Sequence, residues 1–133
     1  MTSNVVSFTN ARRSTIATTR MGWMAAGYID IYTTPRPSTP DTAISTQTKL
    51  VRFTLKSPAG TVSNGVMTAS AMDAALNLAT GTAVFARLLD SSEVVIGDGD
   101  CGATGAGTFV ELDSVSIVQG AMSTITAFSL TEG

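Results

Sequence analysis

Alternation of apolar and polar side chains marks the clearest elements of this chain. In residues 50–56, Leu-Val-Arg-Phe-Thr-Leu-Lys, every second side chain from the valine onward is apolar. Residues 28–33 alternate in the same way, and the face opposite the two isoleucines carries Tyr28, Asp30 and Tyr32. A period of two is typical of strands that bury one face. Both segments are therefore predicted to be half-buried β-strands with a polar face toward water.

The stretch from Thr80 to Asp98 is predicted to form the central hairpin. Its first β-rich run, Ala83–Leu89, ends in Asp-Ser-Ser at residues 90–92, whose side chains readily bond turn backbone. The second run, residues 93–96, ends at a glycine. The following segment, residues 97–107, holds five glycines and is predicted to be a mobile or tightly turned loop.

Shorter β-rich runs continue along the chain. Asn64-Gly65 is a strong turn signal before a strand, and the ambiguous residues 70–79 are interpreted as a strand with an irregular middle. About eight short strands with frequent turns favour a mainly β protein, a single antiparallel β-sandwich or jelly-roll-like domain over residues 27–133. The later strands are expected at residues 66–69, 108–112, 114–118 and 123–130.

The N-terminal region, residues 1–26, is predicted to be an arm or a short helix. A helix within residues 11–25 would have Asn10 as its N-cap, although its apolar stripe is thin and rich in threonine. Trp23 is open to two interpretations, a core plug over an open end of the sheet or an anchor in a neighbouring subunit.

A proline-rich loop follows the first predicted strand. Residues 34–47 contain Pro35, Pro37 and Pro40, which are incompatible with a central strand. Long loops without regular structure are often functional, and the prolines lower the entropic cost of ordering this one against a partner.

Composition changes this picture by pointing to partners. The 133 residues fit one domain, but only 14% are charged, where about 25% is usual. Proteins that stay dispersed carry more charge than this, so part of the surface is expected to be buried against other subunits. The longest apolar runs are too short to cross a bilayer, and no secretory signal is expected at the N-terminus.

Charge is unevenly distributed along the chain. Up to Lys56 there are seven basic and two acidic residues, whereas the remainder has Arg87 and eight acidic residues. The two parts can interleave in the fold, or a basic arm on one subunit can meet an acidic patch on the next. Three arginines in an arm do not make a basic face at a pI of about 4.8, so nucleic acid is not expected as a partner.

Few residues offer chemistry. The chain has no histidine and one cysteine, Cys101, which excludes catalytic Ser-His and Cys-His pairs and an intrachain disulfide. Asp98-Gly99-Asp100 could contribute to a calcium site, but the remaining ligands of a calcium loop are missing. The sequence therefore predicts a protein without enzymatic activity, metal or cofactor.

The order of several turn and strand motifs carries a family resemblance. Together they resemble small structural proteins of tailed bacteriophages and prophages over roughly residues 27–130. The motifs are Ile29-Asp30-Ile31-Tyr32, Arg36-Pro37, Pro40-Asp41-Thr42-Ala43, Asn64-Gly65-Val66, Ala79-Thr80-Gly81-Thr82-Ala83, Arg87, Asp90-Ser91, Gly102 to Leu112 and Ser116-Ile117-Val118-Gln119-Gly120.

The resemblance implies a non-enzymatic virion component built on a β-sandwich, such as a head decoration or cement protein that is assembled in the host cytoplasm. Expected partners are the major capsid protein or other virion proteins, together with further copies of this chain. A neck or tail position and a carbohydrate-binding host-recognition module are the alternatives. Neither a membrane nor a nucleic acid is expected. Partner contacts are predicted at Arg12, Arg13, Arg20, Trp23, Arg36, Pro37 and Pro40.

Overall fold

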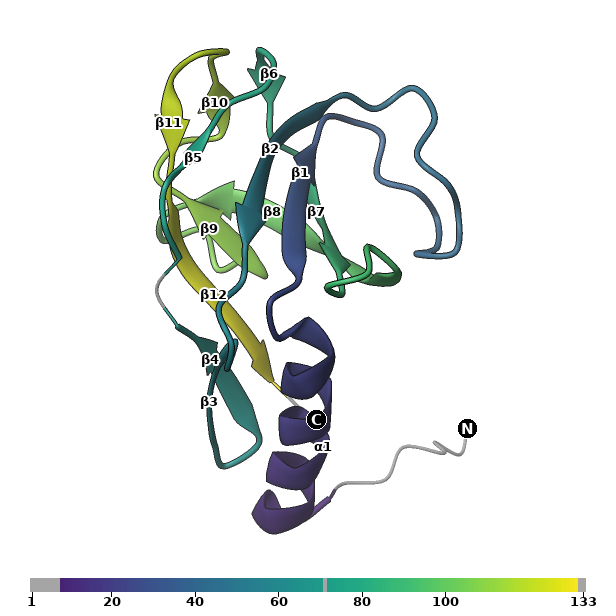
Figure 1. The fold of residues 1–133 in the computed structure, drawn as a ribbon, viewed down its shortest axis with the longest axis vertical. Helices are drawn as coiled ribbons and strands as arrows, with labels where there is room; N and C mark the ends of the chain where they lie inside the picture. The colour runs from purple at the N-terminus through teal and green to yellow at the C-terminus, as the bar shows by residue number, and fades with distance from the viewer. Residues whose placement is uncertain (1–7, 71, 132–133) are drawn as a thin grey trace, which may run out of the picture.

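A computed structural model describes residues 8–70 and 72–131 and shows a mainly β protein with one helix, as predicted (Figure 1). Within these residues, no helix has the length and hydropathy needed to span a membrane. The elements are α1 (Asn10–Met24), β1 (Tyr28–Tyr32), β2 (Lys49–Thr54), β3 (Gly60–Ser63), β4 (Val66–Ala69), β5 (Ala75–Leu76), β6 (Gly81–Thr82), β7 (Phe85–Leu89), β8 (Val95–Ala103), β9 (Val110–Leu112), β10 (Ser116–Ile117), β11 (Met122–Ser123) and β12 (Ile125–Thr131).

One large, curled sheet organises the molecule. Its eight strands lie in the order β2-β1-β7-β8-β9-β12-β4-β3, and two short ribbons, β10–β6 and β11–β5, lie at the end opposite α1 (Figure 1). All pairs in the large sheet are antiparallel except β8 and β9, which run parallel. This pair departs from the expected all-antiparallel arrangement because residues 104–109 turn back along β8 before β9 begins.

The predicted central hairpin is present but continues further than the sequence indicated. Strands β7 and β8 pair from Phe85 with Asp100 to Leu89 with Val95. The segment expected to be a glycine loop is therefore strand up to Ala103, and the turn is confined to the residues after it. Gly105 and Gly107 in that turn have positive φ angles, and their N–H groups donate to the carboxylate of Glu111. The chain reverses with the help of this carboxylate and forms the parallel pair.

The hydrophobic core lies on the inner face of the curled sheet. Alternate residues of β1, β2 and β7 point into it, as the alternating pattern predicted. The strands on the other side of the curl and the end of α1 complete it. Its largest members include Phe53, Ile29, Ile31, Val51, Leu88, Met24, Met67, Leu112 and Phe128.

On the opposite face of β1, Asp30 and Tyr32 are buried and Tyr28 is partly buried, which corrects the prediction that these three side chains face water. Asp30 is 1% exposed, and the ring of Tyr32 stacks on Phe85 with centroids 5.3 Å apart. Burial, followed by the negative charge of Asp30, raises the pKa of Tyr32 above its ordinary value. The sequence could not show this because covering groups come from neighbouring strands.

A charge ladder runs across this face and consists of Arg52, Asp30, Arg87 and Asp98. Its members stand opposite one another on β2, β1, β7 and β8, with alternating sign. Arg52 donates to both carboxylate oxygens of Asp30 at 2.7 and 2.9 Å, and Arg87 binds Asp98 in the same way at 2.7 and 2.9 Å. Such bidentate pairs are the strong form of ionic hydrogen bond. Hydrogen bonding to the carboxylates raises the pKa of both arginines.

Helix α1 closes one end of the fold. Its N-cap is Thr9, one residue before the predicted Asn10, and the Thr9 hydroxyl accepts from the N–H of Arg12. The helix packs on the β3–β4 hairpin, where Arg13 donates to the carbonyl of Asn64 at 3.0 Å. At its C-terminal end Met24 is 1% exposed, whereas Trp23 is 53% exposed. Trp23 is thus not the core plug, because methionine fills that place.

The contrast between Met24 and Trp23 gives a direct stability test. We expect Met24→Ala to lower the free energy of unfolding by about 2–5 kcal/mol, because it leaves a cavity in the core. Trp23→Ala removes a half-exposed ring and should cost less than about 1 kcal/mol. Urea unfolding of both variants measures the difference, and equal losses would contradict this assignment of core and surface.

The pair Arg87 and Asp98 is tested by removing one charge. The two side chains are 5% and 1% exposed, so Asp98→Asn leaves a buried guanidinium without its counter-ion and should cost about 3–5 kcal/mol. Asp73→Asn is the matched control, because Asp73 is 94% exposed and its pair with Lys56 spans 3.6 Å. The control should change stability by less than about 1 kcal/mol. A cost for Asp98→Asn no greater than that of the control would show that the ladder contributes little.

Candidate functional site

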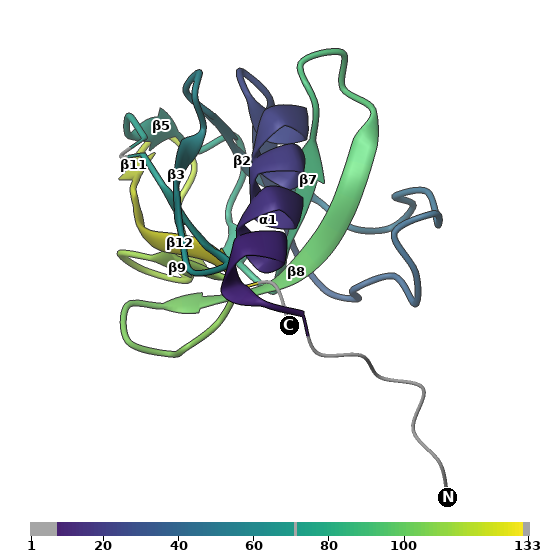
Figure 2. The same ribbon diagram turned by 90° about the horizontal axis from the view of Figure 1, so that it is seen from below.

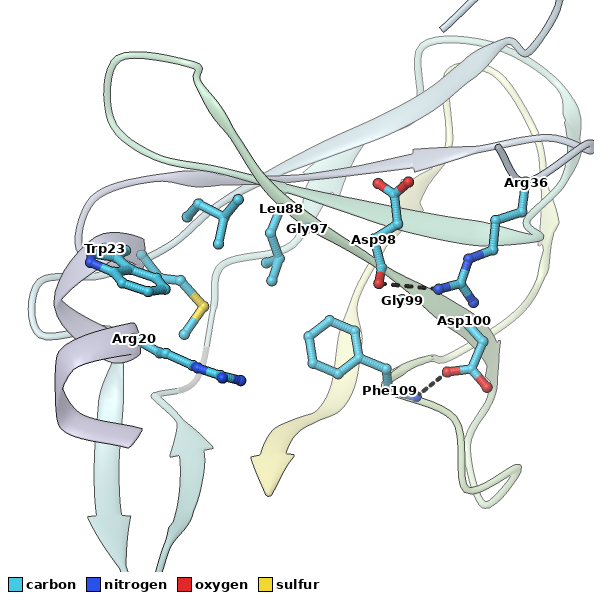
Figure 3. Close-up of a pocket in the computed structure, with 11 residues that line it drawn as sticks. Arg20, Trp23, Arg36, Leu88, Gly97, Asp98, Gly99, Asp100 and Phe109 are labelled. Carbon is cyan, nitrogen blue, oxygen red and sulfur yellow. Dashed lines mark hydrogen bonds between the residues drawn. The ribbon is translucent and has the colours of Figure 1, made fainter. Parts of the chain in front are cut away.

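A cleft of about 630 Å³ lies between α1 and strand β8 (Figure 3). Arg20 and Trp23 stand on one side of it, Arg36 and Asp100 on the other, and the ring of Phe109 lies between them. Met24, Leu88 and residues 96–99 complete the lining. The volume is within the range of about 300–1,000 Å³ that is usual for ligand sites.

Two glycines of β8 form the floor of this cleft. A Cβ atom at Gly97 would meet nothing within 4 Å, so the floor there is open. A Cβ atom at Gly99 would overlap the ring of Phe109, so the glycine provides the seat for that ring. Phe109 also packs edge-on against Phe128, with centroids 4.8 Å apart. The glycines therefore keep the cleft open at one point and fix its aromatic wall at the next.

The backbone of β8 presents an edge to the cleft. The N–H of Cys101 donates to the carbonyl of Val84 on the β7 side, at 3.3 Å. Because backbone groups alternate in direction along a strand, those of Asp98 and Asp100 point away from β7. The Asp98 carbonyl accepts from Arg36 Nη2 at 3.2 Å, which agrees with this direction. Strand β9 pairs with β8 only at residues 101–103, so the outer edge of residues 95–100 has no strand partner within the described part of the chain.

The two aspartates that suggested a calcium site have other contacts. The carboxylate of Asp98 is paired with Arg87, and that of Asp100 accepts from the N–H of Phe109 at 2.8 Å. Among residues 8–70 and 72–131, no group of three or more acidic, histidine or cysteine side chains is placed to hold a metal ion. Both aspartates thus shape the edge of β8 and the position of Phe109.

The structure brings together three of the seven residues predicted to contact partners. Arg20, Trp23 and Arg36 line the cleft, although they come from α1 and the proline-rich loop. Arg12 is exposed on α1 outside the cleft, and Arg13 contacts the β3–β4 turn. The prolines lie beyond the lining as well: Pro37 is partly buried and Pro40 is exposed.

Sequence reasoning did not find the wall and floor of the cleft. Phe109 was assigned only to a strand, and Gly97 and Gly99 only to a loop. Two glycines at alternate positions of a strand leave one face of that strand without side chains. The pattern is informative only once the segment is known to be a strand, and the sequence predicted a loop here.

A second exposed surface lies at the opposite end of the molecule and was also not predicted. This apolar patch consists of Leu76, Leu78, Val118 and Met122, each about half exposed, on the β5 and β11 end of the fold (Figure 1). Asn77 holds its segments together, because its side-chain N–H donates to the carbonyl of Val118 at 3.0 Å and its oxygen accepts from Ser123 at 2.6 Å.

Comparisons with protein-family models, with curated proteins and with solved structures give no match to this chain.

Cys101 directly follows Asp100, the last residue of β8 in the cleft lining, and its side chain is buried. Burial, with a smaller effect of the Asp100 charge, raises the pKa of its thiol to about 12. The folded protein therefore keeps this thiol protonated at pH values where an unfolded chain would release the proton.

This shift predicts a loss of stability at alkaline pH. Below about pH 8 the thiol is mostly protonated in both states, and its contribution is almost fully present. As the pH rises further, the unfolded chain ionises first, so the free energy of unfolding should fall by about 1 kcal/mol by about pH 10. Chemical unfolding at about pH 8 and 10 measures the change, with Cys101→Ala as the comparison. The same pH dependence in the alanine variant would show that other groups cause it.

Proposed function

We propose that this chain is a non-enzymatic structural protein of a tailed-bacteriophage virion, a head decoration or cement protein that binds the capsid lattice. The observation that carries the proposal is the cleft, where residues of the helix and of the proline-rich loop meet at an edge of β8 that pairs with no strand among the described residues. The order of turn and strand motifs supplies the link to phage structural proteins. In this proposal the curled sheet serves as a sandwich or jelly-roll type of platform.

Two separate surfaces suit a protein that joins neighbours. The cleft lies between α1 and β8 (Figure 3), whereas the residues of the apolar patch lie on and beside β5 and β11, which are at the end of the fold opposite α1 (Figure 1). A subunit with two contacts can bridge the major capsid protein, or another virion protein, and a further copy of itself. Weak contacts repeated over a particle give strong binding through avidity. Low surface charge fits the same role.

A carbohydrate-binding module is the second candidate, because Trp23 is half exposed beside the cleft. The two tyrosines, which could extend a sugar-binding platform, are engaged elsewhere. Tyr32 is buried against Phe85, and the guanidinium of Arg52 lies 4.6 Å from the ring centroid of Tyr28. A single tryptophan is a small platform, so the structural role is preferred.

Binding to particles tests the proposal. Purified protein would be added to phage particles assembled without it, and bound copies would be counted after sedimentation. We expect saturable binding, loss of at least about tenfold in affinity for the double variant Trp23→Ala and Arg36→Gln, and no change for Lys56→Gln, whose lysine is exposed outside the cleft.

The same particles also test what binding does. Decorated heads should release DNA at a higher temperature than undecorated heads. Attachment only to the neck or tail, seen by immunoelectron microscopy, would replace the head assignment with the alternative position. Absence of the protein from any virion would overturn the proposal.

A further inference from the structure

We propose that Asn64 is a latent deamidation site, which helix α1 keeps closed while it lies on the β3–β4 hairpin. Release of the helix from this hairpin would let the side chain of Asn64 convert to aspartate or isoaspartate. A covalent modification of this kind is independent of a role in virions.

The dipeptide Asn64-Gly65 provides the chemistry. The chain has four asparagines, and Asn64 is the one that precedes a glycine. In deamidation the backbone nitrogen of the next residue loses its proton and attacks the side-chain amide carbon. A new C–N bond closes a cyclic imide, and the side-chain amide nitrogen leaves as ammonia. Water then opens the imide to aspartate or isoaspartate. Glycine hinders the attack least, because it has no Cβ atom.

Two residues of α1 hold the reacting peptide unit. The N–H of Gly65 donates to the Oγ atom of Ser14 at 2.9 Å. The carbonyl of Asn64 accepts from Nη2 of Arg13 at 3.0 Å. Both groups belong to the peptide unit that must rotate to bring its nitrogen to the side-chain amide. The helix therefore restrains this peptide unit at both of its polar groups.

The side chain of Arg13 also covers the turn. Gly65 is buried, and a Cβ atom there would lie 2.6 Å from Cβ and 2.8 Å from Nε of Arg13. Asn64 itself is exposed, so water can reach its side chain for the second step. The site thus has its leaving group and its water, and only the attacking nitrogen is restrained.

The sheet alone does not supply this restraint. Ser63 pairs with Val66 across a two-residue turn, in which Asn64 and Gly65 have positive φ angles of 51° and 80°. Hydrogen bonds of such a hairpin join the residues that flank the turn, so the N–H of Gly65 has no partner in the ladder. Its acceptor comes from α1, which packs on the hairpin (Figure 1 and Figure 2). Protection of Asn64 therefore depends on docking of the helix.

Modification would make release of the helix difficult to reverse. Isoaspartate adds a carbon atom to the main chain of a turn whose length sets the register of the hairpin. The peptide unit that binds Ser14 and Arg13 would then be displaced. Deamidation at Asn64 would accordingly leave a covalent record that α1 had left the hairpin.

Rates of deamidation in matched variants test the restraint. The whole protein would be incubated in mildly alkaline buffer, digested, and analysed by tandem mass spectrometry to locate the change at Asn64. Ser14→Ala removes the acceptor of the Gly65 N–H and should raise the rate about 2- to 10-fold, the effect of one hydrogen bond on an opening equilibrium. Thr15→Ala is the control, because the Thr15 hydroxyl donates within the helix, and it should react at the parent rate. An unchanged rate for Ser14→Ala, or an equal rise in both variants, would overturn the proposal.

Two further measurements need no folded variant. In denaturant the parent protein and Ser14→Ala should deamidate at the same rate, at least about tenfold faster than the folded parent, because no helix holds the turn. Hydrogen exchange of the Gly65 N–H in the folded parent should be slow for the same reason. A folded protein that deamidates as fast as its unfolded chain, or a Gly65 N–H that exchanges without protection, would contradict the restraint by α1.

Discussion

The bidentate pair between Arg87 and Asp98 is the interaction on which the arrangement of the sheet depends. Both side chains are almost fully buried, so each requires its partner. The ladder places charges of alternating sign opposite one another on four neighbouring strands. A slip of one residue in any pair would turn these charges into the apolar core. The ladder therefore specifies register as well as contributing hydrogen bonds, and it holds β8 where it forms the cleft.

The two faces of strand β8 have different roles: one carries side chains that fix its position in the sheet, and the other lines the cleft. Toward the ladder it carries aspartates, one paired with an arginine and one with the N–H of Phe109. Toward the cleft it carries Gly97 and Gly99, which leave room for Phe109 and for a ligand. Glycine in a strand interior lowers the stability of the strand. The ion pair of Asp98 with Arg87, on the other face of β8, offsets this loss of stability. This combination explains how a glycine-rich strand is held at the wall of an open site.

Local patterns were sufficient for much of the fold. The β7–β8 hairpin, the core faces of β1 and β2, and the Asn64-Gly65 turn were all predicted, because each depends on residues close in sequence. The other face of β1 was wrongly expected to be solvated, because the side chains that pair with Asp30, those of Arg52 and Lys49, come from the neighbouring strand β2. The sequence did not decide whether Trp23 is buried in the core or exposed, because hydrophobicity alone cannot show which of Trp23 and Met24 at the helix end points inward. The cleft required the long-range contact of α1, the proline-rich loop and β8, which no local signal contains.

The central claim is the proposal that the cleft beside α1 contacts another chain in an assembled phage head. A cryo-electron microscopy map of the virion, at a resolution that traces backbone, tests this claim most directly. The account predicts a neighbouring chain packed against Trp23 and Arg36 of the cleft. A map in which the cleft faces solvent in every copy of the protein, or from which the protein is absent, would contradict it.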